Sequence, residues 1–114
     1  MQREVMNYGQ AKIWDAIWEG DFNKVKKLVG QYPDWIHARN SKGNTLMHLA
    51  CFHGCLEIVQ LLFSQPEGVT IANHRNLDGQ IPFYYAANDR CIDVARFLVS
   101  QEEVDLNLQD QNGN

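Results

Sequence analysis

The sequence lacks the long apolar run that a membrane-spanning helix requires, and its N-terminal segment lacks the apolar stretch and cleavage pattern of a secretory signal. It is also poor in cysteine. Cys51, Cys55 and Cys91 are odd in number and have no framework-like spacing, which predicts reduced thiols and not a disulfide scaffold. These absences predict an intracellular protein, with the cytoplasm as the expected compartment and the nucleus as the alternative.

Positive charge is scarce as well, with 10 Lys and Arg residues against 14 Asp and Glu and a net charge of −4. Nucleic-acid affinity comes mainly from clustered basic side chains, so this balance argues against it. The one basic group, Lys24, Lys26 and Lys27, lies beside Glu19 and Asp21 and predicts a solvated helix face. We therefore expect neither a nucleic-acid partner nor a membrane partner.

Four residues of types that bind zinc lie close together in the sequence, namely His48, Cys51, His53 and Cys55, so a metal site is one candidate. His48 and Cys51 fall three residues apart on one helix, but His53 and Cys55 flank the turn at Gly54 and should diverge. Structural roles are therefore the favoured interpretation. Cys55 and Cys91 occupy equivalent positions at the start of a second helix, and a helix N-terminus lowers a thiol pKa, so redox reactivity of these two cysteines is the remaining alternative. The glycines are isolated and form no phosphate loop, so no catalytic residue, metal or cofactor is predicted.

What the sequence does contain is an internal repeat. Residues 43–51 recur, with substitutions, as residues 79–87. The tight turns at Gly20, Gly54 and Arg90 are separated by 34 and then 36 residues. A fixed period in this range is typical of stacked repeat units. With 114 residues and 45% apolar content, the chain is expected to form one domain.

Each unit is predicted to hold two short helices around its tight turn. The second helices carry apolar residues at helical spacing, ending in the third unit with Ile92, Ala95, Leu98 and Val99. Residues 40–43, 76–79 and 110–113 begin with Asn or Asp and end with Gly, which favours type I turns. The predicted helices cover residues 11–19, 22–29, 45–53, 56–63, 82–88 and 92–99.

The segment 64–72 is about three residues longer than a usual return loop. Insertions in repeat arrays are mostly surface decoration, and that is the favoured interpretation. A role in recognition is the alternative.

The stretch TLMHLA at residues 45–50 resembles the Thr-Pro-Leu-His-x-Ala signature of the ankyrin repeat. The resemblance covers residues 8–114. It is strong in the middle unit, clear in the third and weak in the first. It implies an all-α repeat solenoid, an ankyrin-type stack of helix-turn-helix units joined by hairpin-like loops. The whole chain, 1–114, is then a single domain, with an N-terminal capping repeat at 8–39, a second repeat at 40–75, a third at 76–109 and the start of a fourth at 110–114.

Several residues have structural roles in this frame. The Thr45 hydroxyl is expected to cap the helix that follows it. The resemblance implies that His48 bonds the neighbouring hairpin, with Tyr84 at the equivalent position of the third unit. Gly20 and Gly54 suit a left-handed helix end, where Arg90 of the third unit would cost about 1 kcal/mol.

The resemblance also implies a protein–protein interaction module, a scaffold or adaptor without catalysis, that binds another protein through its hairpin tips and concave groove. Trp18 and Phe52 occupy equivalent positions in neighbouring units, either as a contact pair for a partner or as packing residues. The candidate partner-binding residues are Trp18, Glu19, Arg39, Ser41, Lys42, Asn44, Phe52, His53, Arg75, Leu77, Asp78, Gln80, Asn88 and Asp89.

Two alternatives remain open. The first alternative is that the chain is a targeting or regulatory segment of a larger multidomain enzyme or channel whose activity lies outside these residues. Otherwise, if the chain ends at Asn114, the apolar C-terminal face of the third unit lacks a cap and mediates self-association.

Overall fold

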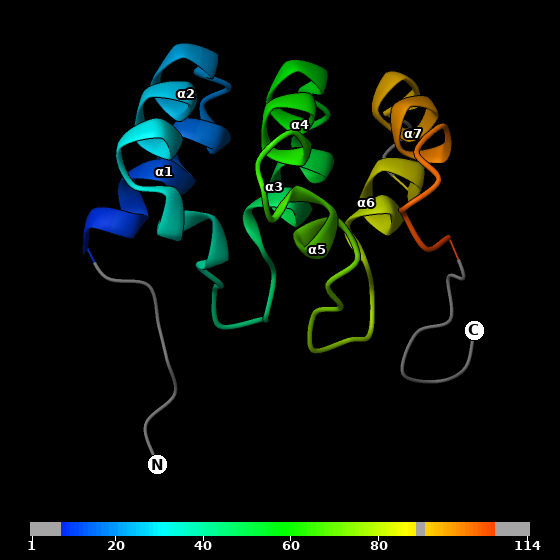
Figure 1. The fold of residues 1–114 in the computed structure, drawn as a ribbon. Helices are drawn as coiled ribbons and strands as arrows, with labels where there is room; N and C mark the ends of the chain where they lie inside the picture. The colour runs from blue at the N-terminus through cyan, green and yellow to red at the C-terminus, as the bar shows by residue number, and fades with distance from the viewer. Residues whose placement is uncertain (1–7, 89–90, 107–114) are drawn as a thin grey trace.

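A computed structural model describes residues 8–88 and 91–106 and consists of three helix pairs that lie side by side (Figure 1). No strand is assigned within these described residues. The all-α ankyrin-type stack that the sequence predicts is therefore confirmed. The helices, in chain order, are α1 (Tyr8–Trp18), α2 (Phe22–Gln31), the 3-10 helix η1 (Pro33–His37), α3 (Leu46–His53), α4 (Leu56–Phe63), α5 (Gly68–Ala72), α6 (Pro82–Asn88) and α7 (Ile92–Val99).

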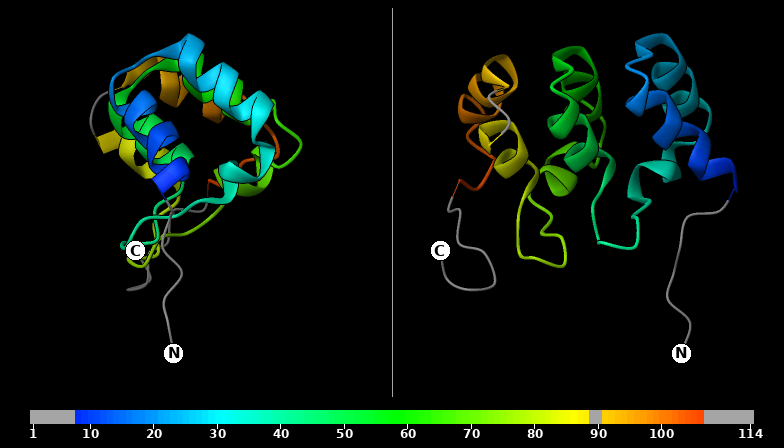
Figure 2. Two further views of the ribbon diagram at one scale, coloured as in Figure 1. Left: turned by 90° about the vertical axis from the view of Figure 1, so that its left-hand side faces the viewer. Right: turned by 180° about the vertical axis from the view of Figure 1, so that it is seen from behind.

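The pairs pack as successive layers. Helix α3 contacts α1 on one side and α6 on the other, while α4 contacts both α2 and α7. Viewed along the stack, the pairs superimpose and the connecting loops project from the same side of the molecule (Figure 2). Ala16, Ala50 and Ala86, one in the first helix of each unit, are fully buried. Because these side chains are small, neighbouring helices can approach closely at the same point in every layer.

The helix ends follow the chemistry expected of them. The Thr45 hydroxyl accepts a hydrogen bond from the backbone N–H of His48 (3.3 Å) and so caps α3. Gly20 and Gly54, which follow the first helices of units one and two, have φ values of +71° and +75°. These left-handed conformations favour glycine. The equivalent residue of the third unit, Arg90, lies outside the described residues.

The hairpin-like loops are fixed by asparagine side chains. Asn40 Oδ1 accepts hydrogen bonds from the backbone N–H groups of Lys42 (2.9 Å) and Asn44 (3.0 Å). The Gly43 N–H donates to the Asn40 carbonyl (2.9 Å), which closes the predicted turn. Asn76 makes the corresponding bonds in the next loop. The third predicted turn, residues 110–113, lies outside the described residues.

The sequence predicts that the return segment 64–72 is surface decoration, but the structure buries part of it. It contains α5, in which Ile71 and Ala72 are buried in the core. Gly68 is also buried, and a Cβ atom there would collide with the Phe63 carbonyl. The interpretation as surface decoration is therefore wrong, because an apolar residue of this segment packs beneath α3 and α4. Ile36 of η1 is likewise buried in the first unit.

The apolar stripe of the third unit also departs from the prediction. Ile92 and Val99 of α7 are 60% and 54% exposed, while Val94 and Leu98 are buried against the second unit. The sequence predicts one apolar stripe on α7 from its helical spacing, and the structure divides that stripe between a buried and an exposed part. Among the described elements, α7 packs mainly against α4 and α6, and Ile92 and Val99 are exposed.

Candidate protein-binding groove

A concavity of about 360 Å³ opens between the first helices of the units and the loop that precedes α3. One wall is aromatic and apolar, and the opposite rim is polar. Five of the predicted partner-binding residues line it, namely Trp18, Ser41, Lys42, Asn44 and Phe52. The other lining residues are Trp14, Asn40, His48, Leu49 and Tyr85. We call this concavity the aromatic groove.

The wall of the aromatic groove is a row of rings contributed by all three units. The Trp18 and Phe52 rings are stacked, with centroids 6.3 Å apart and planes inclined by 14°. The Tyr85 ring meets Phe52 edge to face, with centroids 6.1 Å apart. Trp18 and Phe52 nevertheless remain 56% and 46% exposed. The rings therefore pack on each other across the repeat boundary and still expose about half of their surface, while contact of this pair with a partner stays a prediction.

The rim is held to the wall by a network of side-chain hydrogen bonds. The Asn76 amide donates to Asn44 Oδ1 (2.8 Å) and to the Tyr85 hydroxyl oxygen (3.1 Å). Burial raises the pKa of Tyr85, against the opposing effect of hydrogen bonds from Asn44 and Asn76, so its hydroxyl stays protonated at neutral pH. Asn76 is buried, and its network fixes the rim residue Asn44 relative to the wall residue Tyr85.

The floor contains the inter-repeat bond that the sequence predicts. His48 Nδ1 accepts from the Thr45 N–H (3.0 Å), so Nε2 carries the proton and donates to the Gln80 carbonyl oxygen (2.8 Å). Burial lowers the pKa of His48 to about 4, against an opposing contribution from the bond to Gln80. The ring is therefore neutral at pH 7, and it ties the second unit to the hairpin of the third.

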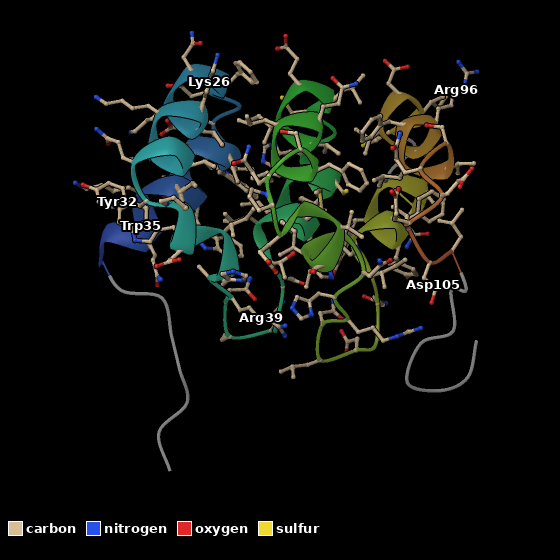
Figure 3. All side chains as sticks on the ribbon, viewed as in Figure 1. Lys26, Tyr32, Trp35, Arg39, Arg96 and Asp105 are labelled. Atoms are coloured by element: carbon tan, nitrogen blue, oxygen red, sulfur yellow. The ribbon has the colours of Figure 1, made fainter. Side chains whose placement is uncertain are left out.

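The remaining predicted residues of the first two units lie around the groove and not in it. His53 is exposed, and its ring packs edge-on against Trp18 with centroids 4.5 Å apart. Glu19 is exposed at the turn after α1. The Arg39 guanidinium donates to the ring of His74, with Nη2 2.6 Å from Nε2, on the loop side of the molecule (Figure 3). Arg39 therefore links two return segments in the structure.

The predicted residues of the third unit are spread along its hairpin and helix. Arg75 is exposed and donates to the Gly79 carbonyl. Leu77 and Asp78 are exposed at the tip, and the Leu77 N–H donates to the Lys42 carbonyl of the neighbouring tip (3.0 Å). Gln80 accepts from His48 through its main chain. Asn88 is exposed at the end of α6, and Asp89 lies outside the described residues.

Three residues of the wall, Trp14, Leu49 and Tyr85, are not among those that the sequence predicts to bind a partner. A signal exists for two of them, because Leu49 precedes Phe52 by one helical turn and Tyr85 is the counterpart of Leu49 in the next unit. Trp14 is 92% buried, and its indole Nε1 has no hydrogen-bond partner in the described part of the chain.

In the second unit, Cys51 and His48 are both buried and have structural roles. Cys51 is fully buried in the core, and burial raises the pKa of its thiol well above the usual range. Both ring nitrogens of His48 are engaged in hydrogen bonds. Among residues 8–88 and 91–106, no group of three or more His, Cys, Asp or Glu side chains is arranged to hold a metal ion.

The sequence model of the family described as "Ankyrin repeats (3 copies)" matches residues 13–110. The chain belongs to the ankyrin-repeat family. Ankyrin repeats are protein–protein interaction modules, and their fold is a non-catalytic interaction fold. The aromatic groove therefore lies in a repeat stack whose family generally binds other proteins. None of the helices in the described ranges is both long and apolar enough to cross a membrane.

Two relatives contain a similar segment. The chain is 27% identical over 100 residues to human transient receptor potential cation channel subfamily A member 1, covering 87% of this chain and 9% of that protein. It is 24% identical over 115 residues to Protein ACCELERATED CELL DEATH 6 of Arabidopsis thaliana, covering 90% of this chain and 17% of that protein. The chain therefore spans well under a fifth of either relative.

Proposed function

We propose that this ankyrin stack is a scaffold or adaptor that binds another protein through the aromatic groove and the adjoining hairpin tips. The observation that carries the proposal is the Trp18–Phe52 pair, which exposes about half of two aromatic side chains beside a polar rim. Aromatic side chains that a partner can bury are frequent anchors of protein interfaces. No catalytic role is proposed for any residue.

The rigidity of the rim supports the same proposal. Asn40 fixes the backbone of Lys42 and Asn44, and Asn76 fixes the side chain of Asn44. A surface that is already ordered loses little conformational entropy when a partner binds. The proposed contact surface extends from the groove to Glu19, Arg39, His53, Arg75, Leu77, Asp78, Gln80 and Asn88, and to Asp89, which lies outside the described residues.

The test is affinity capture from an extract of the source cells, with wild type compared against Trp18→Ala and Phe52→Ala. We expect both variants to lose specific partners while keeping the helical circular-dichroism spectrum of wild type. Lys26→Ala is the matched control, because Lys26 is exposed on α2 at the end opposite the loops (Figure 3). Equal capture by wild type, both groove variants and the control would refute the proposal.

A second candidate is a targeting or regulatory segment of a larger multidomain enzyme or channel. The observation that favours it is the short span of the match, 9% of a human cation channel and 17% of a plant protein. Under this proposal, the activity of the larger protein lies in residues outside the 114 of this sequence. The reading frame of the source transcript decides between the candidates: further repeats alone support a scaffold, and a catalytic or membrane-spanning region supports the segment.

Self-association through the third unit is a further proposal, supported by the exposure of Ile92 and Val99 on α7. Sedimentation over a wide concentration range tests it. A mass that rises with concentration for wild type but not for Ile92→Glu is the expected result. A constant monomer mass would exclude it.

For the location, we propose the interior of the cell, with the cytoplasm as the first expectation and the nucleus as the alternative. The support is chemical: three cysteines cannot all pair within one chain, and Cys51 is buried without a disulfide. Fluorescence microscopy of a tagged protein, expressed at its natural level, distinguishes these compartments.

A further inference from the structure

The lining of the aromatic groove is asymmetric in charge. Its wall is formed by rings and an aliphatic side chain, and its rim carries one charged residue, Lys42. The Lys42 side chain is exposed and makes no ion pair or hydrogen bond with any residue in the described part of the chain. Its backbone, by contrast, is held on both sides, because its N–H donates to Asn40 and its carbonyl accepts from Leu77. The backbone of Lys42 is therefore fixed on the rim, and its ammonium group lies at the end of a flexible side chain anchored there.

The volume of the groove limits what it can hold. About 360 Å³ is near the lower end of the range of ligand pockets, roughly 300–1,000 Å³. That volume suits one large side chain with its neighbouring backbone. The exposed faces of Trp18 and Phe52 favour an apolar or aromatic side chain, because burying these rings is the main favourable term available there.

We propose that the aromatic groove recognises a short partner segment in which one large apolar side chain stands next to an aspartate or glutamate. The apolar side chain packs on Trp18 and Phe52, and the carboxylate pairs with Lys42. This inference rests on the proposed function, and it adds the chemical class of the partner.

The chief competing occupant is a cationic side chain, since aromatic rings attract cations through their faces. The charge of the lining opposes it. Lys42 repels a second cation, and among residues 8–88 and 91–106 no carboxylate lines the groove to offset that repulsion. Glu19 and Asp78 are exposed and lie outside the lining; the charge of Asp78 reaches Tyr85, whose pKa it helps to raise, but as a smaller cause than burial. His48 is neutral on the floor and attracts neither sign strongly.

Synthetic fluorescent peptides of one length test the proposal by anisotropy titration against the folded chain. The set pairs a central Phe, Leu, Lys or Gly with flanking Asp, Asn or Lys in every combination. We expect the Phe and Leu peptides with flanking Asp to bind tightest. Trp18→Ala should weaken them by at least about tenfold, and Lys42→Glu by about three- to tenfold.

The charge reversal also supplies the sharpest readout. Lys42→Glu should transfer the preference from the Asp-flanked to the Lys-flanked peptides, whereas the control Lys26→Glu should leave the ranking unchanged. Preference of wild type for central or flanking Lys would overturn the inference. A ranking of the peptides that is the same for wild type and Lys42→Glu would also overturn the inference. If binding still depended on Trp18 in that case, binding in the groove itself would stand. Absence of any Trp18-dependent peptide binding would also overturn the inference, while the capture experiment judges the proposed function separately.

Discussion

The Trp18 indole and the Phe52 phenyl ring lie nearly parallel on neighbouring repeats, with centroids 6.3 Å apart, and both stay about half exposed. They occupy equivalent positions, 34 residues apart in the sequence. One pair therefore joins the first repeat to the second and presents an aromatic surface. At this pair, positions that hold the stack together are also proposed to bind a partner.

A double-mutant cycle on this pair measures its contribution to stability. Trp18→Ala and Phe52→Ala should each lower the free energy of unfolding, and the double variant should lose less than their sum. The difference should be about 0.5–1.5 kcal/mol, the usual coupling of an aromatic pair. Urea denaturation followed by circular dichroism measures all four proteins. Strict additivity would mean that the rings make no energetic contact.

Acid should destabilise the stack through His48. Its pKa is about 4 in the folded chain and near 6.5 when unfolded, so the folded state favours the neutral ring. Above pH 6.5 both states are neutral and the group has no pH effect. As pH falls from 6.5 to 4, the unfolded chain takes up the proton first, and stability should fall by roughly 3 kcal/mol.

His48→Gln is the control for that pH dependence. Gln at this position can still accept from the Thr45 N–H and keep the capping box, but it does not titrate. The variant should therefore be less sensitive to pH in this window. His74, whose pKa is also lowered by burial, contributes equally to both proteins. Parallel stability curves for wild type and His48→Gln would show that His48 is not the group responsible.

Two glycines with the same backbone conformation should differ in their tolerance of alanine. Gly20 and Gly54 both have positive φ, but a Cβ at Gly20 meets no atom within 4 Å, whereas one at Gly54 lies 2.5 Å from Cys91 Sγ. Gly20→Ala should cost about 1 kcal/mol from backbone strain alone. Gly54→Ala should cost clearly more, by thermal denaturation. Equal losses would argue that the Cys91 side chain moves aside freely.

The return segment 64–72 should behave as core. Ile71 is fully buried in α5, and Ile71→Ala should cost about 2–5 kcal/mol. Thr70, the preceding residue, is exposed, and Thr70→Ala should change stability by no more than about 0.5 kcal/mol. Chemical denaturation of both variants makes the comparison. A mild effect of Ile71→Ala would restore the view of this segment as surface decoration.

The elements that the sequence predicts well are those governed by local rules. Thr45 is a helix cap, Gly54 is a left-handed stop, and Asn40 forms an Asx turn, because each depends only on residues a few positions away. The family resemblance predicts that His48 forms a hydrogen bond between repeats, because it names the neighbouring hairpin as the partner of this residue. The structure adds its geometry and the neutral state of its ring.

The features that the sequence did not predict depend on contacts between segments that are far apart in the chain. Helix α5 has five residues, too few for a periodic pattern, and the burial of Ile71 follows from how α3 and α4 pack above it. The 35-residue interval between Ile36 and Ile71 was an available signal. Tyr85 joins the groove only because its repeat stacks beside Phe52, so its role there required the relative placement of two units.

Site-specific photo-cross-linking tests the central claim most directly. A photoreactive phenylalanine analogue is placed at Phe52 in the wall of the groove, or at Lys26 on α2, which does not line the groove, and the protein is irradiated in the presence of cell extract. The account predicts a discrete cross-linked partner from Phe52, lost when Trp18 is also changed to alanine, and none from Lys26. Cross-linking of the same partner from Lys26 but not from Phe52 would contradict it.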